Sequence, residues 1–345
     1  MQKYLDIIAR GEPLSRSEAE GAMRAMMSGD APDEHMAALL MGLRTRGEQL
    51  DELVGFTKAM RDFAVDVACD DPHAIDLCGT GGDGVNTFNI STTASFVCAG
   101  AGATVAKHGN RSVSSKSGSA DVLETLGVEI ELEKDGVEYC LEEAGIAFLF
   151  APYFHPAMRH VMPVRKSLGV RTFFNILGPL CNPAGVKRQL VGAFNLQTAQ
   201  WMIQILAELD AEHAITAHSK DGLDELSISD ATTIFEYDQA DRNPVPRSRE
   251  VGPEKHEIDR APAATLEGGT ADDNATILRK ILSGDDTSPR RDVVLLNAGY
   301  ALHASDRFDD IDEAIDAARE SIDSGAALDK LGTLIEVSNE APASG

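Results

Sequence analysis

Long apolar runs are absent from this chain of 345 residues. No stretch approaches the length of a bilayer-spanning helix, and the segment after Met1 lacks the apolar core of a signal peptide. These absences predict a cytoplasmic protein that makes no contact with a membrane. The length and the hydrophobic fraction of 43% are typical of a folded protein with a substantial core and room for two domains.

Cysteine is also scarce. The five cysteines, Cys69, Cys78, Cys98, Cys140 and Cys181, are scattered without the close spacing of metal-binding motifs. An odd and dispersed set predicts neither a disulfide framework nor a zinc site. We therefore interpret these residues as small buried hydrophobic side chains.

The chain is short of positive charge. It carries 31 basic and 56 acidic residues, a net charge of −25 at pH 7, and only 11 of the basic residues are lysines. Such a surface repels a polyanion, which argues against nucleic acid as a partner. Solubility alone would explain the excess, but the scarce lysine and pairs such as Asp309-Asp310 favour a halophilic protein adapted to high intracellular salt. On that interpretation the protein loses structure at low salt.

Hydrophobic periodicity divides the chain into two parts. About the first 65 residues have helical spacing, and a capping-box pattern from Ser15 to Glu18 competes with one from Ser17 to Glu20. From Ala74 onward apolar runs alternate with helical stretches, which predicts an α/β fold with a mostly parallel central sheet flanked by helices. Strands are expected at about 74–78, 103–106, 147–151, 190–194 and 214–217, with an edge strand or hairpin at 228–237 and a polar surface segment at 238–262.

A glycine-rich stretch from Gly79 to Thr92 follows the first predicted strand and leads into a helix. Glycines allow a close backbone approach, and the free N–H groups of a helix start attract negative charge, so this order of elements predicts a phosphate site. The alternative is a tight turn without a ligand. The stretch matches neither the Walker pattern nor the dinucleotide fingerprint.

A second polar stretch, from Lys107 to Ser119, follows the next predicted strand. It gathers three cations, five hydroxyl groups and two glycines, and no carboxylate interrupts it. An oligophosphate requires these groups, although a solvated basic loop would have a similar composition. Because loops at the carboxyl ends of parallel strands share one crevice, the two stretches are expected to face one ligand.

Two further pairs complete the candidate site. Asp224 and Glu225 are adjacent carboxylates that suit magnesium, with the Ser91 hydroxyl as a further ligand, unless they are only solvated charges. Arg165 and Arg171 flank a predicted helix end beside an apolar, proline-containing segment. A guanidinium fits a carboxylate and the apolar segment fits an aromatic ring, but both arginines could also be plain surface residues.

At these residues the sequence resembles the anthranilate phosphoribosyltransferase family. The matching motifs are Gly-Thr-Gly-Gly-Asp at 79–83, Asn-Ile-Ser-Thr at 89–92, the whole of 107–124, Asn-Ile-Leu-Gly-Pro at 175–179 and Asp-Glu at 224–225. The related pyrimidine nucleoside phosphorylases carry a different pattern in place of the basic stretch. The acidic motif of type I phosphoribosyltransferases is absent.

The resemblance implies a small helical domain, residues 1–66 with about 165–185, and a large α/β domain comprising the rest of 73–345. It implies an active site between the domains and a homodimer that forms through the helical domain. The implied reaction, in tryptophan biosynthesis, transfers the phosphoribosyl group of 5-phosphoribosyl 1-pyrophosphate to the amino group of anthranilate and releases diphosphate.

The resemblance also implies roles for individual residues. Phosphoribosyl pyrophosphate would be held by Gly79, Gly82, Asp83, Thr87, Asn89, Ile90, Ser91, Thr92, Lys107, Gly109, Asn110, Arg111, Ser112, Ser114, Ser115 and Ser119. Anthranilate would be contacted by Gly79, His108, Asn110 and Arg165, the last at its carboxylate. Ser91, Asp224 and Glu225 would bind two Mg²⁺ ions. No general acid or base is expected, because the amine of anthranilate is neutral at pH 7.

Two other functions remain open at this point. The first is an enzyme of the same fold with another acceptor, such as a nucleoside phosphorylase or a transferase for a different aromatic amine. The second is a relative without catalytic activity that binds nucleic acid. The overall negative charge opposes the second function, and the Asp224-Glu225 pair would have no purpose in it.

Overall fold

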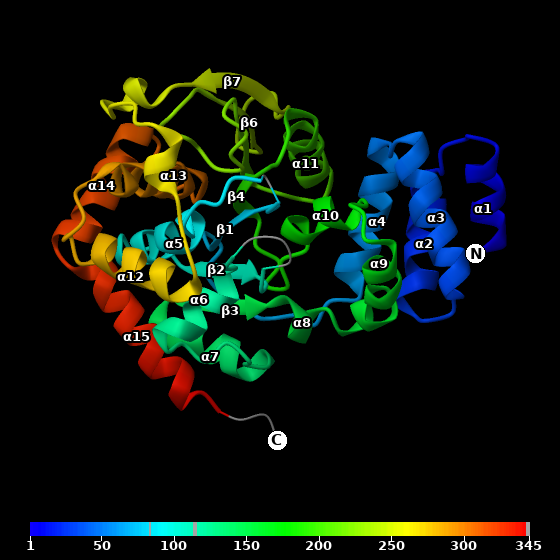
Figure 1. Ribbon diagram of the computed structural model, residues 1–345, viewed down its shortest axis with the longest axis horizontal. Coiled ribbons are helices and arrows are strands. Elements are labelled where there is room, and N and C mark those ends of the chain that lie inside the picture. The colour runs from blue at the N-terminus through cyan, green and yellow to red at the C-terminus, as the bar shows by residue number, and fades with distance from the viewer. Residues whose placement is uncertain (83, 113–115, 343–345) are drawn as a thin grey trace.

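The computed structural model describes residues 1–82, 84–112 and 116–342. A group of helices at the N-terminal end lies beside a larger α/β body (Figure 1). The helices of this group are α1 (Gln2–Ala9), α2 (Arg16–Met27), α3 (Asp33–Arg46) and α4 (Leu50–Asp62). Helix α2 begins after Ser15, whose backbone N–H donates to Glu18 at 2.9 Å, so the first of the two capping registers is the one that forms.

A sheet of seven strands forms the centre of the α/β body. The strands are β1 (Ile75–Gly79), β2 (Val105–Gly109), β3 (Ile146–Phe150), β4 (Arg188–Gly192), β5 (His213–Ser219), β6 (Thr232–Asp238) and β7 (Arg247–Val251). Their order is β3-β2-β1-β4-β5-β6-β7; neighbours from β3 to β5 pair in parallel, and β6 and β7 add antiparallel pairs. The expected mostly parallel sheet is confirmed.

The far edge of the sheet differs from the prediction. β6 and β7 form a hairpin, so β7 rather than β6 is the edge strand. β7 lies inside the polar segment that was expected to be an irregular surface excursion. Its residues Arg247 to Glu250 are exposed, as is common for an edge strand protected by charge.

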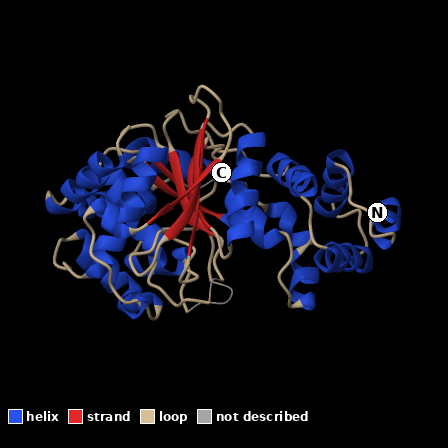
Figure 2. Cartoon of the chain, turned by 90° about the horizontal axis from the view of Figure 1, so that it is seen from above, coloured by secondary structure: helices blue, strands red, loops and turns tan. Residues whose placement is uncertain are grey.

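Helices cover both faces of the sheet (Figure 2). The α-helices of this part are α5 (Ile90–Gly100), α6 (Ser119–Leu126), α7 (Lys134–Ala144), α8 (Ala151–Phe154), α9 (Met162–Leu168), α10 (Phe174–Leu177), α11 (Leu196–Glu208), α12 (Ala271–Leu282), α13 (Pro289–Ala304), α14 (Ile311–Asp323) and α15 (Ala326–Glu340). Short 3-10 helices are η1 (Pro156–His160), η2 (Gly178–Leu180), η3 (Pro253–His256) and η4 (Ala263–Leu266). No helix in the described ranges is long and apolar enough to cross a membrane.

The apolar side chains form two cores, one on each side of the sheet. The larger core contains α5 and α12 to α15, and the other joins the N-terminal helices to α10 and α11. Phe173, just before α10, stacks on Phe56 of α4 with 4.3 Å between ring centroids. The segment around α9 and α10 is thereby fixed to the helical group; α9 lies beside the N-terminal helices and α10 lies between them and the sheet (Figure 1).

Candidate active site

The site is organised by the carboxyl ends of the parallel strands. β1 and β4 pair in register so that Gly79 lies beside Gly192, and β4 pairs likewise with β5. The loops that follow β1, β2 and β5 therefore leave the sheet at the same edge. These are the three loops that contain the glycine stretch, the basic stretch and the acidic pair.

The glycine loop is tied to the acidic pair through its backbone. The N–H of Gly81 donates to Oδ2 of Asp224 at 2.7 Å, and Thr80 Oγ1 lies 3.4 Å from the same oxygen. A Cβ atom on Gly79 would lie 2.6 Å from that carboxylate oxygen, which explains why glycine is needed there. The glycine loop and the acidic pair thus form one structural unit.

Gly192 is a site residue that the sequence analysis missed. A Cβ atom at this position would overlap the backbone carbonyl of Asp224, so only glycine lets the acidic loop lie against the end of β4. Its signal in the sequence was a glycine inside an apolar strand, which often marks the close approach of another backbone.

The start of helix α5 is held from two sides. The N–H of Ser91 donates to Oε1 of Glu225 at 3.2 Å. Asn89, which precedes the helix, accepts from Asn274 at 2.9 Å and donates to the carbonyl of Ser117 at 3.4 Å. The expected proximity of the glycine loop and the basic stretch is therefore present, since Asn89 and Ser117 belong to the two stretches.

Keeping both carboxylates of the acidic pair ionised is unfavourable, because they are adjacent and largely shielded from water. Burial, and then the neighbouring Asp224 carboxylate, raise the pKa of Glu225 to about 8. Within the described ranges Glu225 has no ion-pair partner. Two adjacent carboxylates with a serine hydroxyl nearby are the oxygen donors that Mg²⁺ takes, and a cation would remove this cost.

The basic stretch is less free than its composition suggested. Lys107 is buried, and its Nζ donates to the carbonyl of Leu77 at 2.6 Å. Arg111 forms ion pairs with Asp121 at 3.2 Å and Glu124 at 2.7 Å, both on α6. In this conformation two of the three cations are engaged by the protein, because the helix after the stretch supplies the carboxylates that the stretch lacks.

Asp121 also organises the backbone of this loop. Its Oδ2 accepts from the N–H of Gly118 at 2.7 Å and from that of Ser112 at 3.2 Å. Ser119 Oγ donates to the carbonyl of Asn110 at 3.3 Å. The loop is thus folded around one carboxylate, with Asn110 and Ser119 side by side.

The remaining predicted phosphate ligands vary in position. Thr87 forms an isolated bridge with Glu267, and Gly82 accepts from Arg171 through its carbonyl. Thr92 and Ile90 are buried, and the N–H of Ile90 donates to Phe88, so Ile90 fixes the helix start rather than offering a free donor. A Cβ on Gly109 would lie 2.7 Å from the Phe148 ring. Asp83, Ser114 and Ser115 lie outside the described residues.

His108, in the basic stretch, lies against a second histidine, His155. The rings of His108 and His155 are buried with centroids 5.1 Å apart. Nε2 of His108 and both ring nitrogens of His155 make no hydrogen bond of normal geometry within the part of the chain described. Burial lowers the pKa of both groups, to about 4 for His155, so both rings are neutral near pH 7.

Asp76 was not singled out in the sequence, yet it positions His108. It is fully buried in β1 and accepts from the N–H of His108 at 3.1 Å and from Asn182 Nδ2 at 2.8 Å. Burial raises the pKa of Asp76 to about 6. The sequence did contain a signal for Asp76, which is a lone acidic residue within an apolar strand. A buried carboxylate requires hydrogen-bond partners, so such a residue indicates a buried polar network.

The two predicted arginines have different surroundings. The Arg165 guanidinium lies 5.0 Å from the ring of Phe174 and has no carboxylate partner among the residues described. Burial lowers its pKa. Arg171 donates to the carbonyl of Gly82 and lies 5.0 Å from the ring of Phe194. Arg165 is therefore available for an acidic ligand, whereas Arg171 ties the α9–α10 segment to the glycine loop.

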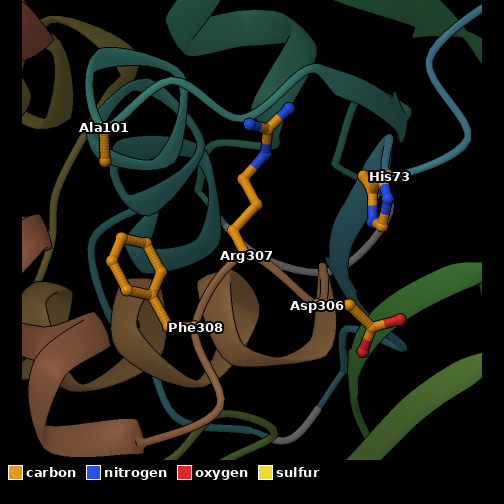
Figure 3. Close-up of a pocket in the computed structure, with 5 residues that line it drawn as sticks. All are labelled: His73, Ala101, Asp306, Arg307 and Phe308. Atoms are coloured by element: carbon orange, nitrogen blue, oxygen red, sulfur yellow. The ribbon is translucent and has the colours of Figure 1, made fainter.

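A cavity of about 350 Å³ lies elsewhere, lined by His73, Ala101, Asp306, Arg307 and Phe308 (Figure 3). His73 precedes β1 and Ala101 follows α5, so the cavity is at the amino ends of the parallel strands. It is separate from the edge where the glycine loop and the carboxylates meet.

Known proteins match this chain over nearly its whole length. Residues 71–328 match the model of the glycosyl transferase family, a/b domain, and residues 2–64 match its helical bundle domain. The anthranilate phosphoribosyltransferase of Salinibacter ruber is 75% identical over 341 residues, which cover 99% of each chain. This chain belongs to the anthranilate phosphoribosyltransferase family. It is an enzyme of that family, a pentosyltransferase of tryptophan biosynthesis.

Solved structures of the anthranilate phosphoribosyltransferase family share the fold over its whole length. The crystal structure of the Thermus thermophilus protein has a TM-score of 0.90 and 38% identity, covering 97% of this chain and 99% of that one. The Saccharomyces cerevisiae protein in complex with PRPP and Mg has a TM-score of 0.89 and 28% identity, covering 98% of each chain.

Proposed function

We propose that this chain transfers the phosphoribosyl group of 5-phosphoribosyl 1-pyrophosphate to the amino group of anthranilate at the edge of the sheet described above. The observation that carries this assignment is the joint anchoring of a phosphate-type loop and two carboxylates. Gly81 N–H contacts Asp224, and Ser91 N–H contacts Glu225. The N–H groups of a helix start attract a phosphate, and the two carboxylates that it faces attract metal cations. Such an arrangement suits a phosphate ligand that is bound together with its cations.

The phosphoribosyl pyrophosphate site uses both stretches. The proposed ligands are Gly79, Gly82, Asp83, Thr87, Asn89, Ile90, Ser91, Thr92, Lys107, Gly109, Asn110, Arg111, Ser112, Ser114, Ser115 and Ser119. For Arg111 to bind a phosphate it must exchange Glu124, its exposed ion-pair partner at 2.7 Å, for the ligand. That exchange costs little, because exposed ion pairs are weak.

The metal site consists of Asp224, Glu225 and the Ser91 hydroxyl, and we propose that it holds two Mg²⁺ ions. The raised pKa of Glu225 supports this proposal, because a cation beside the two carboxylates would relieve their repulsion. When bound, the metal neutralises charge on the departing diphosphate. The glycine loop fixes the carboxylates for this role, because Gly81 N–H and Ser91 N–H each donate to one of them.

Anthranilate is proposed to lie against Gly79, His108, Asn110 and Arg165. Arg165 would pair with the anthranilate carboxylate, which supplies the acidic partner that its described surroundings lack. The neutral His108 ring offers Nε2 to the substrate, because this atom is buried and makes no hydrogen bond of normal geometry with the described residues. Positioning brings the amine to the anomeric carbon, where the C–N bond forms as the bond to diphosphate breaks and the nitrogen releases a proton to solvent. Because the amine is already neutral at pH 7, the reaction requires no general base.

The decisive assay follows the loss of anthranilate fluorescence on addition of phosphoribosyl pyrophosphate and Mg²⁺, at low and high KCl. Turnover that needs all three components supports the proposal. Parallel assays with other aromatic amines and with a nucleoside plus phosphate address the alternatives of the same fold. Faster turnover of one of those substrates would overturn the assignment of anthranilate.

The first prediction concerns the metal ligands. Asp224→Asn with Glu225→Gln should reduce turnover by roughly a hundredfold or more and abolish its dependence on Mg²⁺, because charge stabilisation in a closed site contributes several kcal/mol. Glu142→Gln with Glu143→Gln is the matched control, because it removes the same charge from an exposed adjacent pair on α7. Equal activity of the two double variants would show that the metal lies elsewhere.

We further propose the homodimer through the helical domain of residues 1–66 and about 165–185. This proposal rests on the family resemblance, and one of the exposed large apolar residues, Met41, lies in α3 of this domain. Sedimentation equilibrium at molar KCl measures the mass directly, and a single 36.9 kDa species would exclude the dimer.

A further inference from the structure

Three ligand atoms converge far from the proposed active site. Nε2 of His213 lies 3.2 Å and Nε2 of His303 lies 3.1 Å from Oε1 of Glu236, and all three atoms lie within 4.8 Å of one another. His213 is the first residue of β5, Glu236 belongs to β6, and His303 is in the last turn of α13. The cluster therefore joins two strands and a helix at the amino end of β5.

The outer nitrogen of each histidine is already occupied. Nδ1 of His213 contacts Oδ1 of Asp306 at 2.5 Å, and Nδ1 of His303 contacts the carbonyl oxygen of Phe308 at 2.9 Å. Both contacts are to oxygen acceptors, so each Nδ1 carries its proton. Nε2 of each ring lies at hydrogen-bond distance from Oε1 of Glu236, and a bound ion would take the place of the proton there. Although burial lowers it, hydrogen bonds to Asp306 and Glu236 raise the pKa of His213 to about 9, so this ring is cationic without the ion. An outer oxygen that fixes the tautomer is the usual arrangement around histidine metal ligands.

The outer groups are themselves held in place. Asp306 has a positive φ of 57°, and its Oδ2 accepts from Nε of Arg188 at 2.9 Å. Arg249 donates to Oε2 of Glu236 and leaves Oε1 directed at the two imidazoles. Support of this kind on all three side chains is what a preformed metal site requires.

We propose that His213, Glu236 and His303 bind one Zn²⁺ ion. Ligands at about 2.0–2.1 Å in a tetrahedron lie about 3.3 Å apart, which two of the three observed separations match. Two imidazoles and a carboxylate are donors that zinc accepts. The ion would clamp β5, β6 and α13 together, and it would keep one position for water.

The cluster is buried but not sealed. The side chain of His213 is 4% exposed, whereas those of Glu236 and His303 each keep 16% of their surface exposed. Asp306 lines the cavity of Figure 3 and is 36% exposed. An ion can therefore enter from the surface. Without an ion, Nε2 of His213 keeps its proton, and the cluster is an ion-pair network around Glu236.

The test uses the full chain, stripped with a chelator and titrated with Co²⁺ as a spectroscopic substitute for Zn²⁺. We expect one Co²⁺ per chain with the strong visible absorption of a four-coordinate site, displaced by one equivalent of Zn²⁺. Asp224→Asn with Glu225→Gln should keep this signal, which separates the cluster from the proposed magnesium site. His303→Gln and Glu236→Gln should lose it, whereas His35→Gln, on α3, should not.

Stability provides a second readout. Zinc at a hundred times its dissociation constant should raise the melting temperature of the wild type by roughly 4 °C, and it should not raise that of His303→Gln. A wild-type protein whose Co²⁺ spectrum equals that of the aqueous ion, with no melting shift in zinc, would overturn the proposal and assign the cluster to the ion-pair network. That outcome needs no variant, so it stands even where a substitution prevents folding.

Discussion

At the scale of single residues, a substitution of Arg165 tests whether this guanidinium binds the carboxylate of anthranilate. Its guanidinium lies over Phe174 and has no acidic partner in the described ranges. Arg165→Gln should raise the KM for anthranilate or lower kcat/KM by about 10- to 100-fold, the range of a charge-assisted hydrogen bond to a carboxylate. The KM for phosphoribosyl pyrophosphate should change much less.

The control for this prediction is Arg159→Gln. Arg159 lies in η1, one turn before α9, and is exposed. The substitution Arg159→Gln removes the same charge from the same segment, and it does not alter the proposed anthranilate site. If the two variants have the same steady-state kinetics, Arg165 does not recognise the anthranilate carboxylate.

His155 makes stability depend on pH. Burial lowers the pKa of His155 to about 4 from the usual 6.5. Between these two pH values the unfolded chain binds a proton at this residue and the native chain does not. The resulting stability is complete above pH 6.5 and is lost as the pH falls toward 4. The shift corresponds to at most about 3 kcal/mol.

His155→Leu should therefore flatten the pH dependence of the free energy of unfolding. Leucine has a similar volume and no ionisable group, so the wild type should lose about 3 kcal/mol more than the variant between pH 7 and pH 4. Urea unfolding at fixed KCl across this range measures the difference. His108 remains in the variant and contributes a slope of the same sign. Parallel curves for the two proteins would contradict the assignment.

At the scale of elements, the fit of the acidic loop against β4 depends on one glycine. A Cβ on Gly192 would overlap the carbonyl of Asp224, and backbone cannot move aside as a side chain can. Gly192→Ala should displace Asp224 and Glu225, lower kcat/KM by more than about tenfold and raise the Mg²⁺ concentration needed for half-maximal rate. Steady-state assays over a magnesium series measure both effects.

Gly332→Ala is the matched control for this substitution. Gly332 lies inside α15, and a Cβ there would meet no atom within 4 Å. The change should leave activity unaltered and stabilise the chain by about 0.5–1 kcal/mol, because alanine favours the helix. Unchanged magnesium dependence in Gly192→Ala would mean that the acidic loop adapts without moving its carboxylates.

Most elements could be predicted from the sequence because their apolar periodicity is strong. Edge strand β7 could not, since Arg247 to Glu250 are all exposed and polar and carry no alternation. Its strand conformation comes from pairing with β6, a tertiary contact. The helix start after Ser15 was one of two registers in the sequence, and only the structure shows which hydroxyl caps it.

The site could be predicted in part for a similar reason. Motifs within one stretch, such as Gly79 to Thr92, show their chemistry locally. The support of His108 by Asp76 and Asn182 joins residues from three distant positions, so no single stretch reveals it. The pairing of Arg111 with Glu124 was equally hidden, because the carboxylate follows the basic stretch by a helical turn. Sequence reasoning finds donors and acceptors more readily than it finds their partners.

At the scale of the whole molecule, negative charge accumulates on exposed faces. The segment between α6 and α7 alternates buried and exposed residues, which places Glu129, Glu131 and Glu133 on its exposed side. Burial, and then the nearby Glu131, raise the pKa of Tyr153. A net charge of −25 is held within a compact body, whereas unfolding would spread it. Ionic strength should therefore act on the folding equilibrium itself.

The last prediction follows from this charge. Screening acts over about 3 Å in 1 M salt and about 30 Å in 10 mM salt, so self-repulsion of the folded chain grows as KCl is removed. The melting temperature should fall by more than roughly 4 °C between these conditions, the shift that a few kcal/mol produces in a chain of this length. The double substitution Glu142→Lys with Glu143→Lys, at exposed positions of α7, changes the net charge from −25 to −21, which is two units for each replacement. This variant should show a smaller fall in melting temperature. Sucrose at low salt is the control, because it favours compact states without screening charge. Melting curves by circular dichroism that coincide at both salt concentrations would show that the acidic surface serves solubility alone.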